Sequence, residues 1–303
     1  MINIDQLNDK FSLNGKVKFD KPENGLVYLN VSNKYADASI CLYGANVTSF
    51  RPYHSKEILW LSPKSSFEVG KPIRGGIPVC FPWFGPNKTD PKQPQHGFGR
   101  LMYWDVSETA NQPGGETMIR LQLCASEETK FYWPHEFCAE LSVLVGKTLE
   151  VNLKITNQSA ESFEYTCALH TYYHISSIEN ISITGLLGAS YHNQSEPCEF
   201  IQESPKIKIC KAETRHYHNT EANCMIEDPD FGRKISIAKA GSKITTIWNP
   251  GKETSAKIED LPDDAYLCFV CVEAVNAFDD VIRLTPQESH TTSAMIGLME
   301  ETV

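Results

Sequence analysis

Two ionisable residues stand at the ends of strand-like segments, where side chains commonly reach a binding cleft. Residues 266–273 are apolar on both alternating faces and end at Glu273, a pattern that predicts a central strand. Burial there would raise the pKa of Glu273, which suits a general base near neutral pH. His170 ends segment 163–170 on its more polar face, and an imidazole transfers protons near neutrality. The two residues could form an acid–base pair; an outward-turned glutamate and a structural histidine are the ordinary alternatives.

The segment from residue 73 to residue 100 combines glycines, aromatic residues and two arginines with almost no acidic residue, in a chain of net charge −10. Its Gly75-Gly76 pair and its prolines predict a shaped loop, because glycine permits close backbone approach to a ligand and proline interrupts strand pairing. Guanidinium groups bind phosphate oxygens well. Arg74 and Arg100 therefore indicate an anion site, with His96 beside them; a structural arginine clamp in a turn-rich crossover is the alternative.

Patterns for metals and nucleotides are poor. Cys268 and Cys271 have CxxC spacing, but residues three apart on a strand point to opposite faces. His216 and His218 could share one face of a strand, without an apparent third ligand. The sequence also lacks a GxxxxGK phosphate loop and a dinucleotide fingerprint. We expect neither a metal nor a cofactor.

Period-two alternation dominates the 303 residues and is clearest over 149–156. A short helix is expected over residues 3–11, with Asn3 as its cap. Other strands are expected at 26–31, 38–43, 47–51, 57–61, 118–125, 137–145, 181–184, 207–210, 234–238, 243–248 and 293–298. Many short strands divided by turns indicate a β-sandwich or barrel. We predict one all-β domain over residues 1–303.

The composition limits which classes of partner and which cellular compartment are expected. Thirty-eight acidic against twenty-eight basic residues argue against nucleic acid. Neither a long apolar run nor a secretory signal is present, so we expect a cytoplasmic protein that does not bind membranes, and a monomer. The ten cysteines are expected to be reduced, with those in strand-like runs buried as small hydrophobic residues, namely Cys41, Cys124, Cys167 and Cys268.

Four separated motifs resemble the aldose 1-epimerase (galactose mutarotase-like) superfamily, and within it the hexose-6-phosphate mutarotases, or glucose-6-phosphate 1-epimerases. The resemblance covers nearly the whole chain in order and spacing. The motifs are Ile73–Pro78 with Phe81–Gly85, Gln95–Arg100, Leu169–Tyr173, and Trp248–Pro250 followed by Cys271–Glu273.

The resemblance implies a large antiparallel β-sandwich whose concave face holds a sugar. It also implies interconversion of α and β anomers through the open-chain aldehyde, without cofactor or metal. Glu273 would take the proton from the C1 hydroxyl, and His170 would protonate the ring oxygen. The sugar and its 6-phosphate would be held by Arg74, Gln95, His96 and Arg100.

One segment departs from the family pattern. Where the family has an Asp-Arg-Val-Tyr-like sequence with a sugar-contacting aspartate, this chain reads Glu213-Thr214-Arg215-His216-Tyr217. Either Glu213 replaces that aspartate as a substrate-binding residue, or Thr214 leaves the contact unmade. The expected substrate is a hexose 6-phosphate, glucose 6-phosphate first. The alternatives are a mutarotase of unphosphorylated aldoses and a non-catalytic sugar-phosphate binding protein.

Overall fold

The computed structural model describes residues 2–23, 25–194, 196 and 198–299. Most of its regular secondary structure consists of antiparallel strands, in two eight-stranded sheets, one four-stranded sheet and one two-stranded sheet. Three short α-helices complete the described part, namely α1 (Ile4–Phe11), α2 (Glu127–Tyr132) and α3 (Gly251–Ser255). Among these residues, no helix is long and apolar enough to cross a membrane. The expected all-β fold is confirmed.

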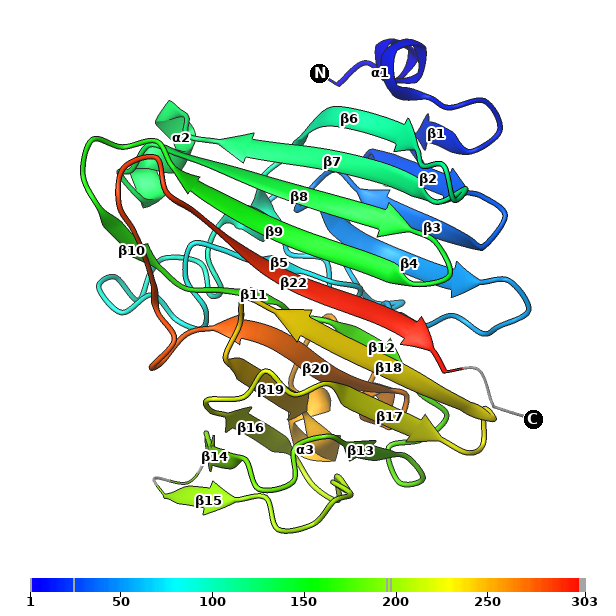
Figure 1. Ribbon diagram of the computed structural model, residues 1–303, viewed down its shortest axis with the longest axis vertical. Coiled ribbons are helices and arrows are strands. Elements are labelled where there is room, and N and C mark those ends of the chain that lie inside the picture. The colour runs from blue at the N-terminus through cyan, green and yellow to red at the C-terminus, as the bar shows by residue number, and fades with distance from the viewer. Residues whose placement is uncertain (1, 24, 195, 197, 300–303) are drawn as a thin grey trace.

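The first eight-stranded sheet carries the longest strands, which run side by side across the front of Figure 1. In β8 and β9 every second residue is fully buried, so one face of the sheet packs inward and the other meets solvent. In spatial order its strands are β13 (Ser182–Thr184), β17 (Cys224–Asp228), β18 (Arg233–Ala240), β22 (Ser289–Leu298), β9 (Leu149–Asn157), β8 (Phe137–Val145), β7 (Thr117–Cys124) and β6 (Asp105–Asn111).

The second eight-stranded sheet carries the segments that hold Glu273 and His170. Its central strand β20 is buried at all eight positions, as expected for a strand covered on both faces. In spatial order its strands are β15 (Glu199–Ile201), β14 (Ser190–Asn193), β16 (Glu213–Tyr217), β19 (Ile244–Asn249), β20 (Phe269–Asn276), β11 (Cys167–Leu169) and β5 (Val79–Cys80), and β12 (Tyr172–His174) also pairs with β20.

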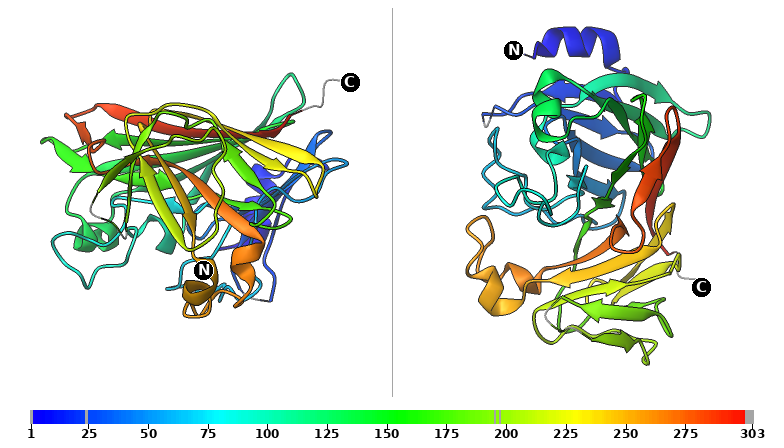
Figure 2. Two further views of the ribbon diagram at one scale, coloured as in Figure 1. Left: turned by 90° about the horizontal axis from the view of Figure 1, so that it is seen from below. Right: turned by 90° about the vertical axis from the view of Figure 1, so that its left-hand side faces the viewer.

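The four-stranded sheet packs behind the upper part of the first sheet, as the right-hand view of Figure 2 shows. One apolar core joins them, with side chains such as Leu29, Phe50, Ile119 and Leu141 fully buried. Its strands are β1 (Val17–Asp20), β2 (Tyr28–Ser32), β3 (Ala36–Cys41) and β4 (Asn46–Pro52); the two-stranded sheet pairs β10 (Phe163–Tyr165) with β21 (Ile282–Leu284).

The predicted N-terminal helix is confirmed, with the Asn3 side chain accepting a hydrogen bond from the backbone N–H of Gln6 at 3.1 Å. Three strand predictions are corrected. Residues 57–61 form isolated β-bridges at Leu59 and Leu61 and no continuous strand. Residues 207–210 likewise form one isolated bridge, at Ile207. Residues 265–267 form a 3₁₀ turn, η2, before β20 begins.

Segment 163–170 is also broken, because Thr166 leaves the sheet. Its N–H donates to the Pro82 carbonyl at 3.1 Å, and its hydroxyl accepts from the Phe84 N–H at 2.8 Å. The segment therefore forms two strands, β10 and β11, that pair with different neighbours.

The cysteines differ from expectation in one pair and at Cys268, which is half-buried and not buried as predicted. Cys124 of β7 lies directly opposite Cys138 of β8, and the two form a disulfide. Cys124 is exposed, not buried as predicted. The other eight cysteines are free thiols, of which Cys41 and Cys167 are buried as expected.

Candidate active site

A row of polar side chains crosses the second sheet from strand to strand. Strand register places Glu273 of β20 opposite Thr246 of β19, and Thr246 opposite His216 of β16. His216 lies opposite His192 of β14, and its Nδ1 lies 2.8 Å from the Thr246 hydroxyl. Residues opposite one another in antiparallel strands point to the same face, so these side chains form one continuous row.

His170 extends this row on the other side of Glu273. Strands β11 and β12 pair with β20 in the same register, immediately before and after His170, which sets this histidine opposite Glu273. Its Nδ1 lies 3.4 Å from Glu273 Oε1. Both side chains are buried, and the His170 ring stacks on Tyr172 with 4.9 Å between centroids.

The row forms the floor of a cavity of about 530 Å³. The loop of residues 73–100 covers part of it, with Phe84 above His216 at 6.1 Å and His96 above His170 at 5.7 Å between ring centroids. Six of the seven residues expected at the site line this cavity, namely Arg74, Gln95, His96, Arg100, His170 and Glu273. A larger cavity of about 720 Å³ adjoins it at Gln194 and Thr214 but contains none of the expected residues.

Two glycines fix the path of the loop by allowing it to approach the protein backbone closely. Gly75 and Gly76 have φ values of +102° and +70°. A Cβ atom would lie 2.4 Å from the Trp60 carbonyl oxygen at Gly75, and 2.4 Å from the Val47 carbonyl oxygen at Gly76. Only glycine fits this approach, which positions the adjacent Arg74.

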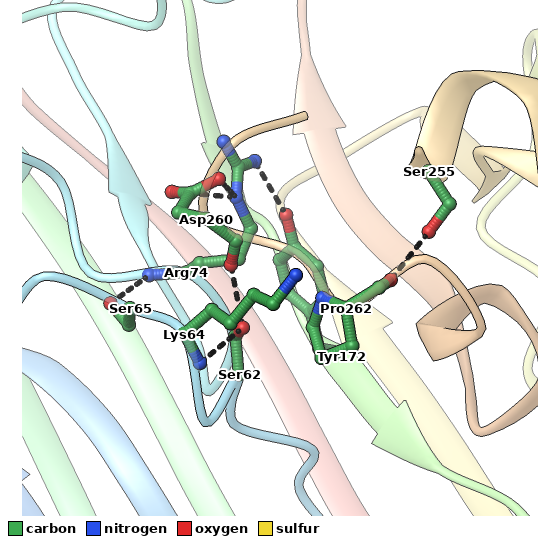
Figure 3. A network of polar contacts seen from close by, with 8 residues as sticks. All are labelled: Ser62, Lys64, Ser65, Arg74, Tyr172, Ser255, Asp260 and Pro262. Atoms are coloured by element: carbon green, nitrogen blue, oxygen red, sulfur yellow. Dashed lines mark hydrogen bonds and ion pairs between the residues drawn. The ribbon is translucent and has the colours of Figure 1, made fainter. Parts of the chain in front are cut away.

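Arg74 is held by a polar network that Figure 3 shows. Its Nε lies 3.1 Å and 3.2 Å from the two carboxylate oxygens of Asp260, and its Nη1 donates to the Tyr172 hydroxyl at 3.3 Å. The Asp260 carbonyl in turn accepts from the Ser62 hydroxyl at 2.6 Å. Although burial opposes it, Tyr172 and Asp260 raise the pKa of Arg74. Arg74 is therefore a fixed cation at the cavity wall.

Arg100 reaches the same cavity from the end of the loop. Its Nη2 donates to the Gln95 carbonyl at 2.7 Å. Its buried Nε has no hydrogen-bond partner within the described part of the chain. Burial lowers the pKa of Arg100, and the charge of Arg74 adds to this. Two guanidinium groups thus lie close enough to repel each other, which favours an anion between them.

His96 presents a defined donor to the cavity. Its Nδ1 accepts from the Gly85 N–H at 3.1 Å, so in the neutral ring the proton sits on Nε2, which lies 3.3 Å from Gln95 Nε2. Burial lowers the pKa of His96 to about 3, with the charges of Arg100 and Arg74 adding to it. His96 is therefore a neutral hydrogen-bond donor.

The environments of Glu273 and His170 shift their proton affinities in opposite directions. Burial raises the pKa of Glu273 well above its ordinary value. Burial lowers the pKa of His170 well below its ordinary value, and His96, Arg100 and Arg74 lower it further. At rest the proton belongs on the carboxyl group. Opposite shifts in adjacent groups are typical of acid–base sites.

Three residues at this point could also coordinate a metal. The ligand atoms of His170, Cys271 and Glu273 lie within 4.8 Å of one another. Burial raises the pKa of the Cys271 thiol and of the Glu273 carboxyl. Metal ligands must be deprotonated, so a metal that bound here would displace the protons of the thiol and the carboxyl group.

Glu213 does not join the other predicted residues. Its carboxylate is buried and accepts from Arg215 Nε at 2.6 Å. Alternation along β16 turns Thr214 and His216 into the cavity and Glu213 to the other face. The structure adds lining residues that had not been assigned to the site, namely Phe84, Lys88, Thr166, His192, Gln194, His216, Thr246, Trp248, Ile258 and Phe278.

Comparisons with known proteins identify the family and the fold of the chain. The family model described as aldose 1-epimerase matches residues 28–296. A protein of Salmonella typhimurium, named as a candidate glucose-6-phosphate 1-epimerase, is 34% identical over 247 residues, which is 82% of each chain. The crystal structure of a candidate mutarotase from Salmonella typhimurium matches with a TM-score of 0.89 and 30% identity over 96% of each chain. A galactose mutarotase-like protein from Lactobacillus casei shares the fold, with a TM-score of 0.72 at 16% identity over 90% of this chain and all of that one.

Proposed function

The chain belongs to the aldose 1-epimerase family, and from this premise we propose that it interconverts the α and β anomers of a hexose 6-phosphate, glucose 6-phosphate first. Family membership makes the protein an isomerase that acts on a sugar. In the proposed reaction, ionised Glu273 takes the proton from the C1 hydroxyl. His170 gives a proton to the ring oxygen as the C1–O5 bond breaks. The aldehyde then rotates, and the reverse transfers close the ring on its other face.

One observation carries this proposal. His170 Nδ1 and Glu273 Oε1 lie 3.4 Å apart at the floor of a cavity whose wall also holds Arg74 and Arg100. The pair supplies the acid and the base, and the arginines supply charge for a phosphate. The 6-phosphate is attached through C6 to C5, which flanks the ring oxygen opposite C1, and Arg74, Arg100 and Glu273 line the same cavity.

A second candidate function rests on Asp260. Because its carboxylate already pairs with Arg74, the net charge of the arginine cluster is lower than two guanidinium groups alone would give. This arrangement favours a mutarotase of unphosphorylated aldoses, in which Arg74 has a structural role.

Exchange NMR spectroscopy of the anomers tests both functions. We expect the wild-type protein to accelerate exchange of glucose 6-phosphate more than that of glucose, and Glu273→Gln to lose this acceleration. Glu164→Gln is the matched control, because Glu164 is exposed on β10. Equal acceleration of both sugars would favour the second candidate. Wild-type exchange by Glu273→Gln on every aldose would refute Glu273 as the base.

A further inference from the structure

Two histidines and an aspartate form a hydrogen-bonded line at the end of the polar row away from His170. His218 Nδ1 lies 2.8 Å from Asp279 Oδ1, and His218 Nε2 lies 2.6 Å from His192 Nδ1. Only His192 lines the cavity; His218 and Asp279 stand behind it. The His192 imidazole is therefore the member of this line that meets the cavity.

The line fixes which ring nitrogen of His192 carries the proton. An ionised carboxylate only accepts hydrogen bonds, so His218 donates to Asp279 from Nδ1. When His218 is neutral, its Nε2 atom is an acceptor, and His192 donates to it from Nδ1. Neutral His192 is left with a lone pair on Nε2, its one remaining polar atom.

The charge states agree with this assignment. Burial raises the pKa of Asp279, but the hydrogen bond from His218, a backbone hydrogen bond and the nearby imidazoles together lower it more, so the net shift is downward. Burial lowers the pKa of His192, although the nearby carboxylates of Asp279 and Glu199 oppose this shift. Asp279 is therefore ionised and His192 neutral near pH 7.

A strained turn brings Asp279 to this position. Phe278 precedes it with φ +59°, a left-handed conformation that is rare for a bulky residue. The Asp280 N–H closes the turn on the Ala277 carbonyl at 2.8 Å. The Phe278 ring packs against His216 and His192, with centroids 4.6 Å and 5.0 Å away. Such strain persists where the surroundings enforce it, often at functional sites.

The shape of the substrate decides which of its groups faces His192. In a pyranose 6-phosphate, C1 and C5 flank the ring oxygen. A sugar with C1 at Glu273 and its phosphate at Arg74 and Arg100 turns its C3–C4 edge toward the other end of the row. Resting on the proposed function, we propose that His192 is a specificity-determining residue whose Nε2 accepts a hydrogen bond from the C3 or C4 hydroxyl of the sugar.

Fluorinated substrates test this acceptor, because fluorine replaces a hydroxyl without donating a hydrogen bond. The measurement is kcat/KM for anomer exchange of glucose 6-phosphate and of its 3-deoxy-3-fluoro and 4-deoxy-4-fluoro analogues. We expect the wild-type protein to disfavour one analogue by about tenfold, the effect of one hydrogen bond. This preference should vanish in His192→Ala, return partly in His192→Gln, whose amide oxygen can accept, and persist in the control His54→Ala.

Nitrogen-15 NMR of the imidazoles reads the tautomer without any substrate. We expect the proton of His192 on Nδ1 in the wild-type protein and in the control Asp105→Asn, and a changed tautomer population in Asp279→Asn. A proton on Nε2, or the same analogue preference in wild type and His192→Ala, would overturn the inference. Absence of wild-type exchange would instead refute the proposed function and, with it, the role of His192 in that reaction.

Discussion

His170, which directly follows β11, faces Glu273 of β20, with 3.4 Å between Nδ1 and Oε1. Burial disfavours the charged form of each, so the pair at rest holds one proton, on the carboxyl group. Moving that proton to the imidazole produces the base and the acid that ring opening requires. In the proposed reaction the two side chains thus serve one proton cycle.

Removing both members of the pair should therefore cost no more than removing one. We expect Glu273→Gln and His170→Asn each to lower kcat for anomer exchange by about 10²–10⁴-fold, the range for a lost proton-transfer group. The double variant should match the more damaged single variant, because a single variant already breaks the proton cycle. Exchange NMR on the three variants gives the comparison; multiplying effects would show that the two side chains act independently.

Arg74 should matter for the phosphate and not for the sugar ring. Replacing it with alanine removes a charge-assisted contact, so KM for glucose 6-phosphate should rise by about ten- to a hundredfold. The exchange of glucose should change less than twofold. Arg51→Ala is the control, because Arg51 pairs with Asp37 on the surface. Equal damage to both sugars would assign Arg74 a structural role.

Acid should destabilise the protein through His216. Burial, with His192 and His218 adding to it, lowers the pKa of His216 to about 3, whereas an unfolded histidine titrates near about 6.5. Between these two pKa values the unfolded state binds more protons than the folded state. The free energy of unfolding is therefore unaffected above the unfolded pKa and falls as the pH drops toward the folded pKa. Between pH 7 and pH 4, Tm should fall less in His216→Gln than in the wild-type protein and the control His54→Gln. Parallel curves for all three would contradict the buried, neutral state of His216.

The Gly76 position should not tolerate a side chain. A Cβ atom there would meet the Val47 carbonyl and Asn46 Oδ1 at 2.4 Å and 2.6 Å, at φ +70°. Gly188 has a similar φ of +79° but open space around it. Gly76→Ala and Gly188→Ala share the cost of backbone strain at a positive φ. In chemical denaturation, we expect the free energy of unfolding of Gly76→Ala to fall by more than about 1 kcal/mol beyond that shared cost. Equal losses of unfolding free energy in Gly76→Ala and Gly188→Ala would show that the backbone around Gly76 shifts to accommodate the added Cβ atom.

Strand alternation predicted much of the fold and the buried position of Glu273, because a period of two is a local property of the chain. The same alternation could have separated Thr214 and His216 from Glu213, had the strand been recognised. His192 could not be found this way, because it joins the site only through the register of β14 with β16. The Cys124–Cys138 pair depends on register in the same manner. Partners set by pairing between strands are not encoded in either strand alone.

A bound phosphate should change the pH range in which His170 works. In the unliganded cavity Arg74 and Arg100 lower the pKa of His170, beyond the effect of its burial. A dianionic phosphate between those arginines offsets their charge, so the pKa of the imidazole rises in the complex. Catalysis needs the proton on the pair, so kcat falls as the pH rises through the apparent pKa of the pair. That fall should come at a higher pH for glucose 6-phosphate than for glucose.

Profiles of kcat against pH for the two sugars measure this difference in pH, and Arg74→Ala should reduce it. If kcat of the wild-type protein falls at the same alkaline pH for both sugars, the phosphate binds away from Arg74 and Arg100.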